Sequence, residues 1–314
     1  MRLDIPSNAL EFDRAFATEE QCRRALIEMR WPDGFACPGC GHDHLYRLRC
    51  RASLECANCG RQTSLLAGTI FHASKLPLVV LFRIVYMIVA EKNGTNAMAI
   101  SRQTGVSHRT ALLWVRKVRT IMDSRHREKL SGTVEVDETV IGGKSKGGTG
   151  RGLGPNKAYV VVLAEDKAQD GMGRVRLEPI QRASSEELSA VIERHVEPGS
   201  TVVTDGWKGY KQVGRRNYVH ESRNVKQSGK KAHKSLPLSH LVASLLKRFI
   251  GGMLHGSWRR RWLPLLLAEF EFRLNRRRSE RRPLLFYRVL EVGLERRALT
   301  RAAFNQVARA FTCA

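Results

Sequence analysis

Long apolar runs are missing from this chain of 314 residues. The longest apolar stretch covers residues 76–90 and is interrupted by Pro77 and Arg83, whereas a helix needs about 20 apolar residues to span a bilayer. The first residues, Met1 to Asp4, also lack the apolar segment of a secretory signal peptide. These absences argue against a membrane-spanning or secreted protein and predict a cytoplasmic one.

Acidic residues are scarce relative to basic ones. The chain contains 30 Asp and Glu residues against 54 Lys and Arg residues, which gives a net charge of +24. This excess is larger than solubility requires and predicts a polyanionic partner. An anionic membrane surface is the rival partner, but the lack of a spanning segment favours nucleic acid. We therefore expect a nucleoid-associated protein that makes no membrane contact, with room for two or more domains.

Cysteine is also sparse. The seven cysteines are an odd number, and four of them form two Cys-x-x-Cys pairs separated by 15 residues. In a reducing compartment this pattern indicates a metal site, and four thiolates complete a closed, structural zinc site. We predict a zinc ribbon over residues 31–70 with Cys50 as a packed free thiol; accidental cysteines or a disulfide pair are the alternative. His42 and His44 could replace a cysteine, although four cysteines suffice. The predicted zinc ligands are Cys37, Cys40, Cys56 and Cys59.

Helical patterns lie on both sides of the predicted ribbon. We expect an N-terminal helical segment over residues 1–30 and a helix-turn-helix region over residues 71–128. Residues 97–107 have the pattern of a helix, a turn at Gly105 and a new N-cap at Ser107. The next helix would enter the major groove of DNA, whereas a helical connector with a solvated basic face is the alternative. The residues expected to contact DNA are Arg109, Arg116 and Lys117.

From Gly132 onwards the pattern changes to that of strands. The expected elements are strands at 133–139, 158–164 and 174–180, a helix at 184–195 and a strand at 200–204. A later helix follows. This order predicts an α/β fold for residues 131–290, an RNase H-like mixed sheet flanked by helices, followed by a C-terminal helical tail over residues 291–314.

A glycine-rich segment, residues 142–154, separates the first two predicted strands. Gly143-Lys144-Ser145 suggests a phosphate-binding loop, but that motif also needs a glycine at the position of Glu138 and a following helix. We therefore interpret the segment as a mobile basic hairpin that touches DNA, and a flexible turn is the alternative.

Two aspartates lie on or at the end of predicted strands. Asp137 lies on the polar face of the first strand, and Asp205 ends the fourth. Hard divalent cations prefer oxygen ligands, and two such ions can catalyse phosphodiester cleavage and transfer. His240 follows Asp205 by 35 positions and opens an apolar helical pattern, and Lys247 lies seven positions later on the same helix face. Together with the positive charge, these residues favour a protein that cuts and joins nucleic acid.

Five separate sequence words occur in order along the chain. They are Val-Glu-Val-Asp-Glu-Thr-x-Ile-Gly-Gly-Lys at 134–144, Glu-Pro-Gly-Ser-Thr-Val-x-Thr-Asp-Gly-Trp at 197–207, Ser-x-Leu-Lys-Arg at 244–248, His-Gly at 255–256, and Glu-Phe-x-Phe-Arg-x-Asn-Arg-Arg at 269–277. With these words and the predicted ribbon, residues 15–280 resemble the zinc-ribbon-bearing insertion-sequence transposases of the DDE type.

The resemblance implies a DNA transposase that cuts at terminal inverted repeats and transfers 3′-hydroxyls to target DNA, assisted by Mg²⁺ or Mn²⁺. It implies catalytic metal ligands at Asp137, Asp205 and His240. The histidine stands where the family has a third carboxylate, and residues 239–250 contain no Asp or Glu. Synapsis of two ends further implies a dimer or larger assembly on double-stranded DNA. The residues implied to face DNA near the site are Lys247 and Arg248.

A histidine at the third position leaves alternatives open. Imidazole binds Mg²⁺ less well than a carboxylate does, so the second metal would bind more weakly. Glu269 or Glu271 on a later helix could supply the third carboxylate, or His240 could be structural. Two further functions stand beside an active transposase. One is a catalytically weak or inactive transposase-derived DNA-binding protein, and the other is a Holliday-junction or RNase H-like nuclease without transposition.

Overall fold

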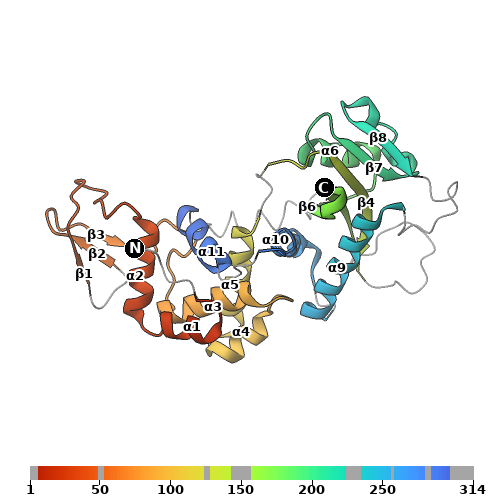
Figure 1. The fold of residues 1–314 in the computed structure, drawn as a ribbon. Helices are drawn as coiled ribbons and strands as arrows, with labels where there is room; N and C mark the ends of the chain where they lie inside the picture. The colour runs from red at the N-terminus through yellow and green to blue at the C-terminus, as the bar shows by residue number, and fades with distance from the viewer. Residues whose placement is uncertain are drawn as a thin grey trace. The chain divides into compact units, whose positions relative to one another are not determined.

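The structure, a computed structural model, divides into two compact units (Figure 1). It describes residues 6–48, 53–123, 128–142, 157–223, 235–255, 258–279 and 284–297. The first unit consists of the described residues within 1–121 and 279–304, and the second of those within 122–278. Across these described ranges, no helix combines the length and the apolar character that crossing a membrane requires.

Two capped helices begin the first unit. Helix α1 spans Ala9–Ala15, and the side chain of Asn8 accepts a backbone N–H of its first turn. Helix α2 spans Glu19–Arg30, and Thr18 and Gln21 form a reciprocal capping box at its start. Both starts use side chains to satisfy amides that the first helical turn leaves without a partner. The segment expected to be helical therefore contains two helices.

A small antiparallel sheet with strand order β1-β2-β3 follows α2. Its strands are β1 Leu45–Arg47, β2 Ser53–Cys56 and β3 Gln62–Ser64. Gly41 and Gly60 directly follow the two Cys-x-x-Cys turns with φ angles of 73° and 67°, a left-handed conformation that glycine adopts without strain. The turns and the sheet bring the two halves of the predicted ribbon together. Cys50 lies outside the described residues.

Four more helices complete the described part of the first unit. They are α3 Leu78–Ala90, α4 Ala97–Thr104, α5 His108–Ile121 and α11 Leu284–Glu295. Phe286 of α11 packs against Phe12 and Phe82, with ring centroids 5.2 and 5.6 Å away. This arrangement differs from the sequence-based division, which assigned residues up to 290 to the catalytic domain. The apolar pattern of α11 indicates that one face is buried, but it does not indicate which surface covers it.

The second unit contains a five-stranded mixed sheet with strand order β6-β5-β4-β7-β8. The strands are β4 Thr133–Ile141, β5 Ala158–Asp166, β6 Met172–Ile180, β7 Thr201–Asp205 and β8 Val219–Arg223. Strands β4, β5 and β6 pair antiparallel, whereas β4, β7 and β8 pair parallel. The predicted α/β fold, an RNase H-like mixed sheet flanked by helices, is confirmed.

One strand of this unit was not expected from the sequence, and one expected hairpin lies mostly outside the described residues. The sequence pattern does not predict β8, because Val-His-Glu-Ser-Arg is polar and largely exposed at the sheet edge. Residues 143–156, which hold most of the predicted glycine-rich hairpin, lie outside the described residues. Single 3₁₀ turns lie at Ala168–Asp170, Lys208–Tyr210, Val213–Arg215 and Arg260–Trp262.

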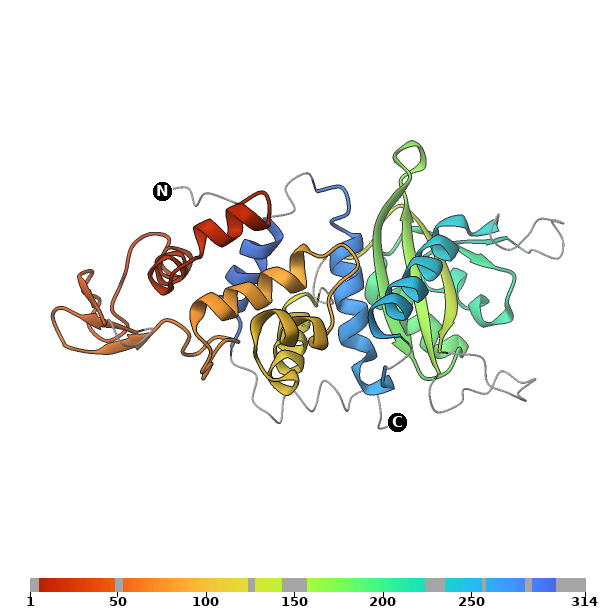
Figure 2. The ribbon, with the colours of Figure 1, turned by 90° about the horizontal axis from the view of Figure 1, so that it is seen from below.

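Helices cover both faces of the large sheet (Figure 2). They are α6 Ser185–His195 on one face, and α9 Pro237–Leu254 with α10 Leu263–Leu274 on the other. Alternation along β4 creates the two faces. Val134 and Val136 join the core beneath α6. Glu135 and Asp137 point to the opposite face, where α9 begins. The predicted polar face of this strand is therefore the face that meets α9.

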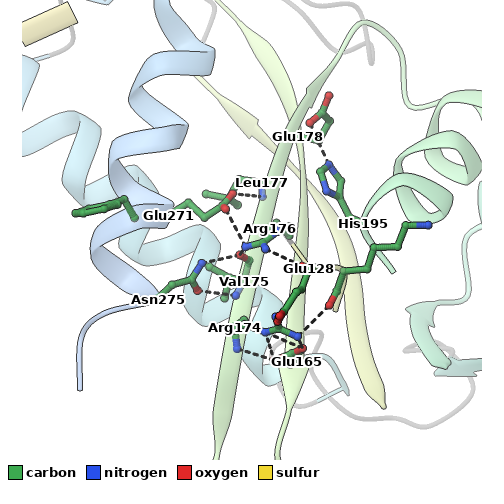
Figure 3. Close-up of polar contacts among 12 residues, drawn as sticks. Glu128, Glu165, Arg174, Val175, Arg176, Leu177, Glu178, His195, Glu271 and Asn275 are labelled. Atoms are coloured by element: carbon green, nitrogen blue, oxygen red, sulfur yellow. Dashed lines mark hydrogen bonds and ion pairs between the residues drawn. The ribbon is translucent and has the colours of Figure 1, made fainter. Parts of the chain in front are cut away.

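Side chains from α10 and from the residue that follows it form hydrogen bonds with the backbone at the outer edge of β6 (Figure 3). Asn275 bonds both backbone groups of Val175, accepting its N–H at 2.7 Å and donating to its carbonyl at 3.0 Å. Glu271 accepts the N–H of Leu177 at 3.2 Å and forms a buried ion pair with Arg176 at 3.0 Å. An edge strand whose backbone groups are satisfied is protected from pairing with another chain. The last of the five sequence words therefore has a structural role in this sheet.

Candidate metal centres

Four cysteine sulfurs of the first unit form one cluster. The Sγ atoms that lie within 4.8 Å of one another belong to Cys37, Cys40, Cys56 and Cys59. The Sγ–Sγ distances include 3.7 Å for Cys37–Cys59 and 3.5 Å for Cys40–Cys56. Ligands about 2.3 Å from a tetrahedral zinc ion lie roughly 3.8 Å apart, so the spacing fits this metal. The Gly39 N–H, 3.4 Å from Cys37 Sγ, is the largest of several hydrogen bonds that together lower the pKa of that thiol to about 6, against the effect of burial.

The nearby histidines form a separate group. His42, Asp43 and His44 lie close together at the surface, and His44 Nδ1 is 2.7 Å from Asp43 Oδ1. The four cysteines alone satisfy the four positions of a tetrahedral site, so neither histidine is needed as a ligand. The predicted four-cysteine cluster of a zinc ribbon is confirmed.

Asp137 and Asp205 lie on the α9 face of the large sheet. The parallel register of β4 and β7 pairs Glu135 with Val203, and two further residues along it set Asp137 beside Asp205. Burial and the negative charge of Asp205 raise the pKa of Asp137 to about 6. Two neighbouring carboxylates with excess negative charge suit a hard divalent cation. Two of the three residues expected to bind the catalytic metals are therefore neighbours in the fold.

Helix α9 brings His240 to the same place. His240 Nε2 lies 3.7 Å from Asp137 Oδ2. At the start of the helix, the Glu135 carboxylate accepts the N–H groups of Leu238 and Ser239 at 2.8 and 2.9 Å. All three residues expected to be catalytic thus meet on one face, together with Glu135, which the sequence pattern places on that face but to which the sequence analysis gives no role. Its position two residues before Asp137 was the available signal, because alternate residues of a strand share a face.

Helix α9 also carries two exposed basic residues, Lys247 and Arg248. Lys247 is exposed, and its positive charge lowers the pKa of Asp137, although burial has the larger, opposite effect. Arg248 is exposed as well. Both side chains are therefore accessible to a phosphate group.

A buried contact on the other face supports the segment after β7. Tyr210 Oη donates to Glu138 Oε2 at 2.7 Å, and the Trp207 N–H donates to Asp205 Oδ1 at 3.0 Å. Burial raises the pKa of Glu138, which lies on the face of β4 opposite to Asp137. These bonds hold the residues that follow Asp205. The sequence analysis missed Tyr210, because no periodic pattern connects it to a partner 72 positions away.

The two later glutamates have arginine partners. Glu271 pairs with Arg176 on β6, and β5 separates β6 from β4. Glu269 Oε1 accepts a hydrogen bond from Arg273 Nη2 at 2.8 Å within α10. Because guanidinium groups balance their charges, these glutamates suit the third metal position less well than His240 does.

Helices α4 and α5 have the spacing of a helix-turn-helix. Gly105 ends α4 with a φ angle of 72°, and the Ser107 hydroxyl accepts the Thr110 N–H at 3.2 Å to cap α5. Arg109 is exposed on the first turn of α5, and Arg116 is half-buried. The local geometry therefore agrees with the expected turn, while DNA binding by this region stays a prediction.

Lys117 differs from the other basic residues of α5. Its Nζ donates to the Ile70 carbonyl at 3.0 Å and lies 4.6 Å from the centroid of the Trp114 ring. Burial lowers the pKa of this lysine. These contacts hold Lys117 against its own unit, so it is less suited to contact DNA than Arg109 is.

Two known domain families match the chain. The family described as a transposase zinc-ribbon domain matches residues 17–62, and the family described as an ISXO2-like transposase domain matches residues 129–275. The first match includes all four clustered cysteines, and the second includes the whole carboxylate face. A protein from Halobacterium salinarum, described as an uncharacterized protein in transposable element ISH50, is 26% identical over 210 residues, which cover 63% of this chain and 70% of that protein. The chain therefore contains a transposase zinc-ribbon domain and an ISXO2-like transposase domain.

Proposed function

We propose that this transposase cuts DNA at transposon ends and transfers the resulting 3′-hydroxyls to target DNA with divalent metal ions. The observation that supports this most is the pair Asp137 and Asp205, neighbours on one sheet face, with His240 Nε2 3.7 Å from Asp137 Oδ2. The residues come from three separate elements and converge on one face, so their ligand atoms could hold metal ions beside one reacting phosphate.

The chemistry of the donor set fits Mg²⁺ or Mn²⁺, with Asp137, Asp205 and His240 as the residues that would hold the ions. Bound divalent cations would supply charge stabilisation at the phosphoryl group and activation of the attacking oxygen. Asp137 serves as a ligand only when ionised, and a nearby cation favours that form against its raised pKa. Because His240 carries no negative charge, we expect Mn²⁺ to support activity better than Mg²⁺.

Basic residues of this chain would hold the DNA. Lys247 and Arg248 on α9 would bind phosphates next to the reacting one, and Arg109 and Arg116 on α5 would contact the transposon ends. Lys117 would support α5 from behind through Ile70. The partners would be the terminal inverted repeats and a target duplex. Synapsis of two ends requires a dimer or a larger assembly on DNA.

A strand-transfer assay with the DNA that flanks the gene tests the proposal. The wild-type protein is expected to nick and join its end DNA, faster with Mn²⁺ than with Mg²⁺. Asp137→Asn and Asp205→Asn should each lower the rate roughly 10³-fold or more, because each removes several kcal/mol of transition-state stabilisation. Asp166→Asn, the same change at the end of β5, is the matched control and should leave the rate within a few-fold of wild type.

A second candidate function is a catalytically weak or inactive transposase-derived DNA-binding protein. The histidine at position 240 favours it, because a carboxylate is missing from the metal site. A wild-type protein that binds the end DNA, but neither nicks nor joins it with any divalent metal, would refute the enzymatic proposal and support this alternative.

A further inference from the structure

The buried carboxylate of Glu135 caps a helix to which it is not joined in sequence. Glu135 lies on β4 and is only 1% exposed. Its Oε2 accepts the N–H groups of Leu238 and Ser239 at 2.8 and 2.9 Å. These amides belong to the first turn of α9, which has no partner for them within the helix, and the N-cap residue Leu236 offers no side-chain hydrogen bond. Glu135 therefore takes the place of a local N-cap.

A cation from another strand holds the same helix start. Arg223 ends β8 and is in register with Asp205 of β7. Its Nη1 donates to the Ser235 carbonyl at 3.2 Å, and its charge also acts on Glu135. An anion from β4 and a cation from β8 thus bind the chain at the beginning of α9. Strand β4 also carries Asp137, and β8 pairs with β7, which carries Asp205.

This attachment lies within one helical turn of His240. Glu135 and Asp137 are alternate residues on one face of β4, roughly 7 Å apart along the strand. Ser239, which Glu135 binds, directly precedes His240, which approaches Asp137. The Glu135–Ser239 bond and the approach of His240 to Asp137 are therefore neighbouring contacts between β4 and α9. We propose that Glu135 is a positioning residue that docks α9 on β4 and so sets His240 against Asp137. The inference rests on the proposed role of His240 as a metal ligand.

Two other roles for Glu135 predict different behaviour. As a direct metal ligand, Glu135 would contribute through its charge, and an amide at this position would be a poor substitute. As a purely structural group, it would affect folding and leave metal affinity unchanged. A positioning role requires only an oxygen that accepts the two helix amides, and its effect on metal affinity must depend on His240.

The test measures the dissociation constant for Mn²⁺ alone on the zinc-loaded, full-length protein, by isothermal titration at one pH. His240→Ala is expected to weaken Mn²⁺ binding roughly 10-fold or more, and Glu135→Leu roughly 10-fold, in the range typical when a partner that orients a metal ligand is lost. The double variant should be about as weak as His240→Ala alone. Glu135→Gln should stay within roughly 3-fold of wild type, because its amide oxygen still accepts both N–H groups.

Glu165→Leu is the matched control. Glu165 is a fully buried carboxylate on β5 that also accepts two backbone N–H groups, from Ser131 and Arg174, at 3.2 and 2.9 Å. This variant should lose stability while its Mn²⁺ affinity stays unchanged. If Glu135→Leu does not fold, Arg223→Met replaces it; it should weaken Mn²⁺ binding several-fold, and only when His240 is present.

The outcomes separate this inference from the proposed function. If Glu135→Leu, or Arg223→Met in its place, weakens Mn²⁺ binding equally with and without His240, the positioning role is wrong and the metal site stands. Equal losses in Glu135→Gln and Glu135→Leu would show that charge matters, and they also overturn the inference. If His240→Ala leaves Mn²⁺ binding unchanged, the proposed metal trio fails and the inference fails with it.

Discussion

The second unit has buried and half-buried carboxylates in two regions that differ in how their charge is balanced. Along β6, Glu165 pairs with Arg174, and Glu271 pairs with Arg176 (Figure 3). On the α9 face, Asp137 lies beside Asp205 and close to Glu135, and the cation that acts on it, Lys247, has a smaller effect than these neighbours. We call these the balanced region and the acidic face.

The pKa values of the two regions shift in opposite directions. Burial alone would raise the pKa of Glu165, but the hydrogen bonds from Arg174 outweigh it and the pKa lies below its ordinary value. Burial and Asp205 both raise the pKa of Asp137, to about 6. The charge of a buried carboxylate that pairs with an arginine is already compensated, whereas a buried carboxylate without such a partner favours a bound cation or a proton. This contrast supports the proposal that the acidic face is the metal site.

The largest effect on stability should come from breaking a pair in the balanced region. Glu271→Ala leaves Arg176, whose side chain is 4% exposed, without its buried partner. We expect a loss of about 3–5 kcal/mol in the free energy of unfolding, measured by urea denaturation. The double variant Arg176→Met with Glu271→Leu should recover most of this loss. A cost below about 1 kcal/mol for Glu271→Ala would contradict the view that this pair is structural.

The opposite sign is expected on the acidic face. In the metal-free protein, Asp137→Asn should raise the stability at pH 8 by an amount on the order of 2–3 kcal/mol, because it removes a buried charge. A folded-state pKa near 6, above the ordinary 3.8, means that the stability of the acid form is complete below about pH 4 and lost as pH rises through 6. The gain in Asp137→Asn should therefore vanish at pH 4, as thermal melts at several pH values would show.

The balanced region supplies the control for that experiment. The pKa of Glu165 is lowered, so its stabilisation is present above the ordinary value of 4.5 and lost as pH falls. Glu165→Gln should therefore destabilise the protein at pH 8. If both substitutions shift stability in the same direction at pH 8, the two regions do not differ as proposed.

The smallest effect should come from adding metal. At a free Mn²⁺ concentration ten times its dissociation constant, the wild-type protein should gain roughly 1.4 kcal/mol of stability. Asp137→Asn and Asp205→Asn should gain almost nothing, whereas Glu165→Gln should gain as much as wild type. The measurement is thermal unfolding of zinc-loaded protein across a Mn²⁺ series. An equal gain in Asp205→Asn would place the bound cation elsewhere.

Local patterns predicted a large part of this molecule. The four-cysteine cluster was predictable because each pair of ligands lies within four residues, and a tight turn brings them together whatever the rest of the fold does. The polar face of β4 was predictable because side chains alternate along a strand. Strand β8 was missed because its residues are polar, and its place depends on hydrogen bonds to β7 rather than on an apolar face.

The candidate site could be predicted only where a local sequence pattern or the family resemblance pointed to it. Asp137 lies within β4 and Asp205 ends β7, whereas His240 came from a resemblance rather than from periodicity. Glu135 and Tyr210 were missed because their partners lie far away in sequence, at Ser239 and Glu138. The sequence also left Glu271 open as a metal ligand, and its pairing with Arg176 became visible only in the fold.

The sequence by itself determined the four-cysteine cluster, the order of β4 to β7 with α6 between them, the alternation that puts Asp137 on a polar face, and the positive charge that favours a nucleic-acid partner. These properties depend on residues near one another in the chain. Only the tertiary structure decided which buried carboxylates are balanced by arginine and which face a helix start. That decision depends on contacts between distant residues, because the pKa and the partner of a buried charge are set by what lies within a few ångströms of it.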